Sequence, residues 1–249
     1  MKESDSELKQ EQIRFVLMRP THPGNVGGVA RAMKTMGLRR LTLVAPQVNL
    51  PSEEAVRRAA GAEDILYTAD VHGDLDGAIK DCQLIIGTTA RKRSVEWPQL
   101  SPEQAAEKLW DASRHGPVAL LFGQERSGLA NPEVERCHYL VRIPTNPDYS
   151  SLNLASAAQI MAYEVFLKGH ASPGALQDIP RYADQESMHR FYKHLEEMLL
   201  DLDFPIARPP VILMRKLMRL FNRARPSDEE LQILRGILSA VQQHVAKKS

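Results

Sequence analysis

Three segments of the sequence are rich in glycines or in small polar and charged side chains, and each lies at or shortly after the end of a run of apolar residues. They are Pro23–Arg31, Leu121–Leu129 and Ile143–Ala155. Open α/β sheets bind their ligands in loops at the carboxyl ends of parallel strands, where glycines let the backbone come close to the ligand. These segments therefore predict a ligand-binding site that is assembled from several loops.

The first segment, Pro23–Arg31, is rich in glycine at the expected start of a helix. Free N–H groups at such a position could bind an anion. The segment matches neither the G-x-G-x-x-G dinucleotide pattern nor a phosphate-binding loop that ends in Gly-Lys-Ser/Thr. A tight turn from a strand into a helix explains its glycines equally well.

The second segment places Glu125 and Arg126 between Gly123 and Gly128. The two opposite charges either lie at the mouth of a site or form an incidental ion pair on a solvated loop. Thr88-Thr-Ala90 also follows an apolar run and is a further loop end of this kind, although it is uninformative alone.

The third segment contains more polar residues than a helix start requires. Ser150 or Ser151 could cap a helix through its hydroxyl group. Capping does not account for Tyr149, both serines and Asn153 together. The segment therefore favours a site over a structural loop.

Metal and hydrolase chemistry find no support in the sequence. Cys137 and His138 are adjacent, whereas the ligands of a zinc site are spaced along the chain. The Gly-x-Ser-x-Gly motif of hydrolases is absent. We expect no metal site and assign Cys137 and His138 to structural or surface roles.

Short apolar runs alternate with helical patterns through the first two thirds of the chain. This alternation predicts an α/β fold with a largely parallel sheet that is covered on both faces. Strands are expected at 13–17, 41–44, 65–67, 84–86, 118–122 and 139–143, and helices at 27–36, 53–60, 75–80 and 153–168.

The composition changes near Gly169, where prolines and glycines without periodicity predict a linker. Beyond it, an apolar stripe from Met188 to Leu202, the pair Pro209-Pro210 and a capping-box spacing of Ser227 and Glu230 predict three helices. A helical unit of this size is marginal alone and should pack on the α/β domain or on a second copy of the chain. The expected parts are a flexible N-terminus at 1–12, an α/β domain at 13–169, a linker at 170–186 and a helical extension at 187–249.

The middle helix of this extension carries a run of positive charge. Arg215, Arg219 and Arg223 recur every four residues and should form one exposed ridge. A polyanion is the natural partner of such a ridge in a chain whose net charge is only +1. Leu213, Leu217, Leu220 and Phe221 are expected to form the packing side of the helix, and Arg91, Arg93 and Arg126 are further candidates for contacts with nucleic acid.

The whole chain gives broader bounds. Its 249 residues include two cysteines, too few for a disulfide framework, and no segment is apolar enough for a signal peptide or a membrane span. We therefore expect a cytoplasmic protein without a membrane partner.

The order and separation of the three loop segments resemble those of the SPOUT superfamily of RNA methyltransferases. Within that superfamily, His22–Asn25, Ala32–Leu38, Cys137–Tyr139 and Asn146–Leu154 are similar to the TrmJ-type group, which methylates the ribose 2′-hydroxyl at tRNA position 32. The resemblance implies a trefoil-knotted sheet, S-adenosylmethionine as the cofactor, tRNA as the substrate and a homodimer. General topology rules would instead favour an unknotted sheet.

The resemblance also implies roles for individual residues. The residues that correspond to the family's catalytic positions are Arg31, Asn25, Glu125, Ser151 and Asn153. The cofactor would be bound by Thr88, Thr89, Ala90, Gly123, Ile143, Ser150, Ser151 and Leu152. Arginine is a poor general base because its guanidinium stays protonated. Arg31 therefore either acts as a base in an altered environment or fixes a phosphate and stabilises the developing alkoxide.

Three other functions compete with this one. The enzyme could methylate another tRNA position or ribosomal RNA, because the loops contact ribose and phosphate rather than the base. A catalytically silent RNA-binding protein is disfavoured by the presence of Arg31, Glu125, Ser151 and Asn153. A nucleotide-dependent oxidoreductase is disfavoured by the missing dinucleotide motif.

Overall fold

The computed structural model describes residues 9–90, 97–170, 182–202, 204 and 210–247. The chain divides into two compact units, Met1–Ile179 and Pro180–Ser249, which are described here one at a time. The division falls inside the segment 170–186 that the composition predicts as a linker. No helix in the described ranges is long and apolar enough to cross a membrane.

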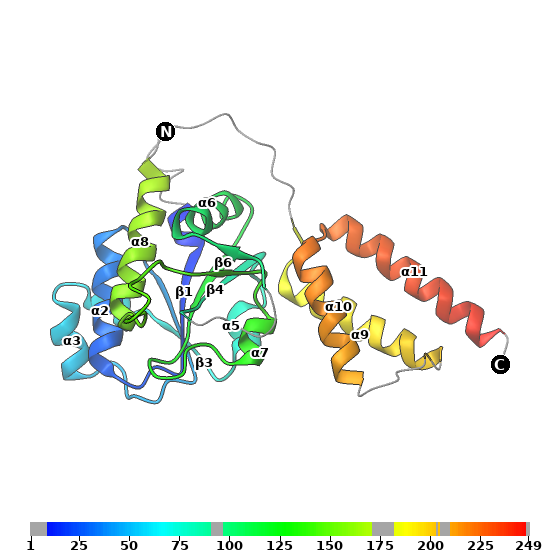
Figure 1. Cartoon of the computed structure of the whole chain (residues 1–249), viewed down its shortest axis with the longest axis horizontal. Helices are drawn as coiled ribbons and strands as arrows, with labels where there is room; N and C mark the ends of the chain where they lie inside the picture. The colour runs from blue at the N-terminus through cyan, green and yellow to red at the C-terminus, as the bar shows by residue number, and fades with distance from the viewer. Residues whose placement is uncertain (1–8, 91–96, 171–181, 203, 205–209, 248–249) are drawn as a thin grey trace. The chain divides into compact units, whose positions relative to one another are not determined.

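The first unit is built on a sheet of seven parallel strands in the order β3-β2-β1-β6-β4-β7-β5 (Figure 1). This sheet confirms the predicted α/β class. The trefoil knot stays a prediction, because strand order and pairing do not trace the loops through one another. The strands are β1 (Ile13–Met18), β2 (Arg40–Val44), β3 (Asp70–His72), β4 (Leu84–Thr88), β5 (Gln99–Leu100), β6 (Val118–Phe122) and β7 (Tyr139–Val141).

Helices cover both faces of this sheet (Figure 1). On one face, α2 (Pro23–Thr35), α3 (Glu53–Ala59), α4 (Glu63–Tyr67), α6 (Pro102–Ala112) and α8 (Leu154–His170) enclose the larger core. On the other face, α5 (Leu75–Ile79) and α7 (Asn131–Glu135) enclose a smaller one.

The central strands are apolar on both faces because both faces are covered. Successive side chains of a strand point to opposite sides, so Phe15 and Phe122 meet in the larger core, with ring centroids 5.2 Å apart. Their neighbours Val16 and Leu121 pack in the smaller core. The sheet is thereby fixed between two apolar layers, and its carboxyl edge is held in a defined position.

The prediction of a strand at 65–67 is wrong, because these residues end helix α4. Glu63 and Asp64 lie in the first turn of that helix, where negative charge is favourable, and Ile65 and Leu66 are buried on its inner side. A short apolar run fits a strand and a buried helix equally well, and here the third strand forms a few residues later at Asp70–His72.

The glycines of α2 serve packing rather than a nucleotide loop. A Cβ atom on Gly27 would lie 2.1 Å from the carbonyl oxygen of Ala55 in α3, and one on Gly28 would lie 2.8 Å from the Cβ atom of Ala155 in α8. Both glycines lie inside α2 and allow it to approach two neighbouring helices closely. The alternative of a glycine-rich anion loop is therefore not needed to explain them.

The second unit consists of α9 (Gln185–Asp201), α10 (Pro210–Ala224) and α11 (Asp228–Ala246). Its core contains residues of the predicted apolar stripe on α9, including Phe191 and Leu195. They pack with Leu231 and Leu238 of α11. The capping box of Ser227 and Glu230 is present as predicted. Of the residues predicted to form the packing side of α10, Leu217 and Phe221 pack on this core, together with Met214 and Met218. The prediction for Leu220 is wrong, because its side chain is 47% exposed.

Candidate active site

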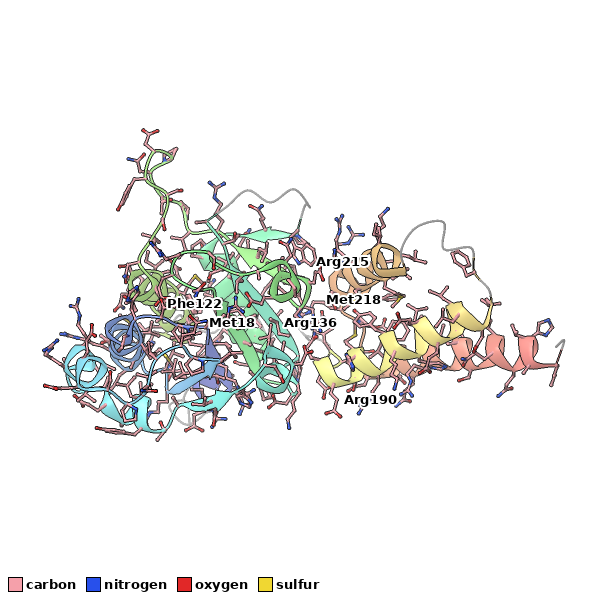
Figure 2. All side chains as sticks on the ribbon, turned by 90° about the horizontal axis from the view of Figure 1, so that it is seen from below. Met18, Phe122, Arg136, Arg190, Arg215 and Met218 are labelled. Carbon is pink, nitrogen blue, oxygen red and sulfur yellow. The ribbon has the colours of Figure 1, made fainter. Side chains whose placement is uncertain are left out.

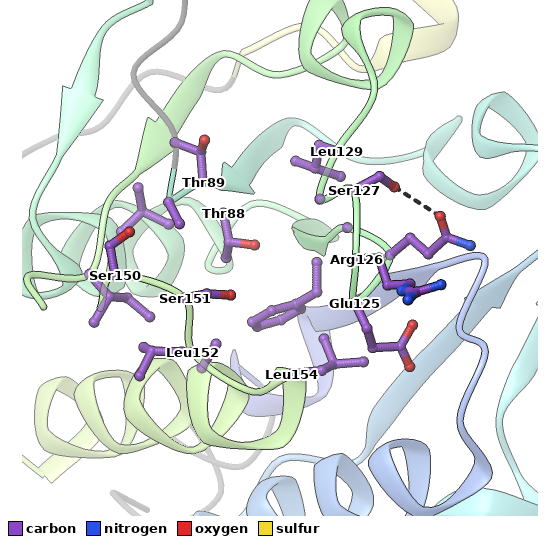
Figure 3. Close-up of a pocket in the computed structure, with 18 residues that line it drawn as sticks. Thr88, Thr89, Glu125, Arg126, Ser127, Leu129, Ser150, Ser151, Leu152 and Leu154 are labelled. Carbon is purple, nitrogen blue, oxygen red and sulfur yellow. Dashed lines mark hydrogen bonds between the residues drawn. The ribbon is translucent and has the colours of Figure 1, made fainter. Parts of the chain in front are cut away.

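A pocket of about 360 Å³ opens where β4, β6 and β7 end (Figure 3). Its walls come from the loops that follow these three neighbouring strands, as expected for ligand sites in parallel sheets. All eight residues proposed from the sequence to bind the cofactor line it: Thr88, Thr89, Ala90, Gly123, Ile143, Ser150, Ser151 and Leu152. The pocket thus combines hydroxyl groups with apolar side chains and exposed backbone, a mixture that suits a ligand with both polar and apolar parts.

The loop after β6 folds back on itself and forms one wall of the pocket. A Cβ atom on Gly123 would lie 2.0 Å from the carbonyl carbon of Gly128, so only glycine fits there. The turn is closed by a hydrogen bond of 2.8 Å from the Gly128 N–H to the carbonyl oxygen of Gln124, and Gly128 has a positive φ of 66°. Ser127 also donates a hydrogen bond to the side chain of Gln124 (Figure 3). This loop is preformed by its own contacts.

Glu125 accepts several hydrogen bonds from the segment between β1 and α2. Thr21 donates through its hydroxyl group at 2.9 Å and through its backbone N–H at 3.2 Å, and the His22 N–H donates at 3.2 Å. The amide nitrogen of Asn25 completes the set at 3.2 Å. A carboxylate that accepts this many hydrogen bonds is fixed in position and orientation.

The same network continues to the third loop. Asn153 donates a hydrogen bond of 2.9 Å to the amide oxygen of Asn25, and its own amide oxygen accepts one from the N–H of Ala155 at the start of α8. The chain Glu125–Asn25–Asn153 therefore connects the first turn of α2 with the loops after β6 and β7. Three of the five residues proposed as catalytic are joined directly, and Ser151 lines the adjacent pocket.

Glu125 keeps its charge in this arrangement. Partial burial would raise its pKa, but hydrogen bonds from its own backbone N–H, from Asn25 and from Thr21 outweigh burial and lower the pKa below its ordinary value. A negative charge therefore stays at the edge of the pocket throughout the neutral range. It also lies next to the N-terminus of α2, where the helix dipole favours an anion.

Arg31 lies apart from this network. Its side chain is exposed on α2, does not line the pocket, and forms no hydrogen bond or ion pair with the described residues. Its guanidinium is therefore available to a group from outside this chain. Arg126 is also exposed and belongs to the pocket wall.

Thr21 and His22 are site residues that the sequence did not reveal. They contact Glu125, which is about a hundred positions further along the chain, through backbone groups and one hydroxyl. Backbone donors carry no residue type, so no sequence pattern identifies them. The parallel pairing of β1 with β6 brings the two loops together.

The remaining candidates are structural or lie elsewhere. His138 is buried, and its Nδ1 accepts a hydrogen bond from the N–H of Ile85, while Cys137 packs in the smaller core. Within the described ranges, no cluster of metal-ligating side chains exists. The predicted nucleic-acid contacts Arg91 and Arg93 lie outside the described residues.

The second unit carries the predicted ridge on α10. Arg215 and Arg223 are exposed and Arg219 is half-buried, while Met218 packs toward the core (Figure 2). The exposed side of this helix thus presents guanidinium groups on a rigid support.

The chain matches two families of known proteins. Residues 12–163 match the SpoU rRNA methylase family, and residues 186–249 match the C-terminal domain of the tRNA methyltransferase TrmJ. A tRNA (cytidine/uridine-2′-O-)-methyltransferase TrmJ from Pectobacterium atrosepticum is 48% identical over 236 residues, which cover 93% of this chain and 97% of the relative.

Solved structures agree with this match. The crystal structure of TrmJ from Z. mobilis ZM4 superposes with a TM-score of 0.79 at 38% identity, over 92% of this chain and 98% of the other. The SpoU methyltransferase AviRb from Streptomyces viridochromogenes, in complex with the cofactor AdoMet, gives a TM-score of 0.50 at 25% identity, over 64% and 61% of the two chains.

Proposed function

The chain belongs to the SpoU rRNA methylase family, and from this premise we propose that it transfers a methyl group from S-adenosylmethionine to the ribose 2′-oxygen of a tRNA nucleotide. The observation that carries the proposal is the pocket at the ends of β4, β6 and β7, with the fixed network Glu125–Asn25–Asn153 at its edge. A C-terminal unit of the TrmJ type supports tRNA as the substrate.

The pocket suits S-adenosylmethionine. Leu152, Leu129 and Ile143 supply apolar surface for a flat base, and the tight loop at Gly123 leaves backbone groups at the wall. When bound, this cofactor supplies a methyl group that its sulfonium already activates, so the protein has to align, desolvate and deprotonate the accepting oxygen.

This chain has residues for these tasks. Asn25 and Asn153 are held rigidly by their hydrogen bonds and can orient the ribose. Arg31 can hold the phosphate of the target nucleotide and stabilise the negative charge that develops on the 2′-oxygen as its proton leaves. A role of Arg31 as the base itself would require an altered environment around its guanidinium.

We place the target at position 32 of the anticodon loop, on the resemblance to the TrmJ-type group alone. The catalytic loops contact ribose and phosphate, so they do not separate this position from others in tRNA or ribosomal RNA. We also propose that the protein acts in the cytoplasm, because its proposed substrate is tRNA.

A homodimer is part of the proposal, supported by α8. This helix is apolar nearly all round, yet Tyr163 and Leu167, one turn apart on the same side, are 47% and 43% exposed. A helix with apolar residues on every side is normally covered on every side. A second copy of this chain would cover the open side.

The test is to map 2′-O-methylation in tRNA from cells with and without this protein, and in unmodified tRNA treated with the pure enzyme and labelled cofactor. We expect one methylated nucleotide, at position 32, to depend on the protein. Methylation of a 2′-oxygen at another position would contradict the proposed target nucleotide but would support the proposed reaction. No transfer to any RNA would favour a silent RNA-binding protein instead.

A further inference from the structure

Tyr149 is the most solvent-exposed large apolar or aromatic side chain in the described part of the chain, at 81%. Its hydroxyl group forms no hydrogen bond with the described residues, and most of its ring is open to solvent. An aromatic ring of this size loses favourable free energy when it stays in water. Its ring is therefore open to a partner from outside the chain.

The loop fixes the backbone that carries this ring. Asn146 to Tyr149 form a turn in which the Tyr149 N–H donates a hydrogen bond of 3.0 Å to the carbonyl oxygen of Asn146. The side chain of Asn146 also accepts one from the N–H of Asp148, and Pro147 restricts the backbone between them. Because the backbone is already ordered, only the two side-chain torsions of the ring lose freedom when it binds.

The turn leads directly into the pocket wall. Ser150 and Ser151 follow Tyr149 and line the pocket (Figure 3), and the hydroxyl group of Thr145 donates a hydrogen bond of 3.2 Å to the carbonyl oxygen of Ser150. In a nucleotide, the base is attached to the carbon next to the one that bears the 2′-oxygen. A nucleotide whose 2′-oxygen reaches the pocket has its base one carbon further out, and Tyr149, next to Ser150 in the chain, is close enough to the pocket wall for its ring to reach that base.

We propose that the ring of Tyr149 stacks on the base of the nucleotide that is methylated. The proposal rests on the proposed function and goes further by naming how the base is held. Stacking uses the face of the base, which every base has, so it holds cytidine and uridine alike without reading their edges. The specificity for the position then comes from contacts elsewhere on the RNA.

The first experiment compares variants of the full-length enzyme on unmodified tRNA. Tyr149→Ala should raise the KM for tRNA about tenfold, the size expected when one base–aromatic stack is lost, while Tyr149→Phe stays near the wild type. Affinity for S-adenosylmethionine should not change in either variant. The matched control is Tyr67→Ala, which removes another tyrosine, 63% exposed on α4, and should leave all constants unchanged.

The second experiment is a double-mutant cycle that combines wild type or Tyr149→Ala with intact or abasic RNA. The abasic nucleotide at the target position keeps the 2′-hydroxyl and lacks the base. If the ring stacks on that base, the abasic RNA should weaken the wild type by a similar factor, and Tyr149→Ala should add no further loss. Methylation of the intact RNA by the wild type tests the proposed function separately, so the two failures can be told apart.

Three results would overturn the proposal. Additive losses in the cycle would mean that Tyr149 does not act on the target base. Conversion of the Tyr149→Ala enzyme to a smaller species in sedimentation would assign the ring to a contact with a second copy of the chain. A loss of cofactor affinity would assign it to the pocket wall.

Discussion

The two units of the chain present polar groups in opposite ways. At the carboxyl edge of the sheet, Glu125, Asn25 and Asn153 bond to one another and are fixed before any ligand binds. On α10 of the second unit, Arg215 and Arg223 are exposed on the helix surface. Chemistry at one oxygen atom requires fixed geometry, whereas attraction to a phosphate backbone tolerates variation in position. This difference matches the proposed function, in which the first unit aligns the reaction and the second retains the RNA.

Arg31 is the residue that can break this comparison, because it belongs to the first unit but is exposed like the arginines of α10. We expect Arg31→Ala to lower the single-turnover rate of methylation about a thousandfold, since the charge that develops on the oxygen loses its partner. Rapid quench at saturating tRNA, with tRNA affinity measured separately, checks this.

The pH dependence of the same variant distinguishes the two roles of Arg31. If Arg31 acts as the base, the rate of the wild-type enzyme should rise with pH as Arg31 loses its proton, and this rise should be missing from the pH profile of Arg31→Ala. Arg39→Ala, which removes an exposed arginine at the opposite end of the sheet, is the control. Unchanged rate and affinity in Arg31→Ala would contradict both roles.

Charge reversal on α10 tests the other side of the comparison. Arg215→Glu, Arg219→Glu and Arg223→Glu together should weaken tRNA binding about a hundredfold at moderate salt and reduce its salt dependence, because several phosphate contacts are lost. Affinity for S-adenosylmethionine should stay the same. The control reverses Arg190, Lys193 and Arg235, which lie on α9 and α11 and change the net charge equally. If both triple variants lost the same amount of tRNA affinity, the effect would come from the net charge of the protein and not from the position of the arginines on α10.

Glu125 tests whether the fixed geometry of the first unit matters. In Glu125→Gln, an NH₂ group would face the donors of Thr21, His22 and Asn25, so the network should loosen and kcat/KM should fall about tenfold. Because the pKa of Glu125 is lowered in the folded protein, its charge persists as the pH falls to about 5. The ratio of wild-type to variant activity should therefore stay constant between about pH 8 and pH 5. Glu53→Gln on α3 is a control, and equal effects of the two substitutions would refute the network.

The smallest effect is expected at the amino end of the sheet, away from the site. Arg14, mostly buried, pairs with Asp81 through two hydrogen bonds of 2.6 and 2.7 Å, and the hydrogen bond from Arg14 lowers the pKa of Asp81. Asp81→Asn should lower the free energy of unfolding by about 1–2 kcal/mol, less than for a fully buried pair because Asp81 is half exposed, and should leave methylation unchanged.

The pH dependence of this stability has a defined sign. The stabilisation is complete above the pKa of Asp81 in the unfolded chain and is lost as the pH falls through its lower pKa in the folded protein. Wild type and Asp81→Asn should therefore converge in acid, as measured by urea denaturation. Asp76→Asn, which breaks the more exposed pair with Arg136, should cost less at neutral pH. A constant difference at all pH values would contradict the assignment.

Local patterns were sufficient for part of this structure. The apolar runs predict β1, β2, β4 and β6, and the spacing of Ser227 and Glu230 predicts the start of α11, because these signals depend on near neighbours in the chain. The run at 65–67 misled because three apolar residues have no distinct period. The prediction that Leu220 packs is wrong because the packing side of α10 is determined by the helices that it meets, and these lie elsewhere in the chain.

The candidate site divides in the same way. Every residue that the family resemblance implies for the cofactor lines one pocket, and strand ends and glycines in the sequence mark the loops to which most of these residues belong. The contacts of Thr21 and His22 with Glu125 could not be predicted, since they use backbone donors brought close by the pairing of β1 with β6. Sequence patterns therefore locate the loops, and the sheet determines which of their atoms meet.

The most direct test of the central claim uses a tRNA whose methylated nucleotide is replaced by its 2′-deoxy form. Transfer of labelled methyl from S-adenosylmethionine by the full-length enzyme should fall to background on this tRNA, while its binding affinity stays close to that of the unsubstituted tRNA. Undiminished transfer to the deoxy substrate would contradict the account, because the methyl group would then go to an atom other than the ribose 2′-oxygen.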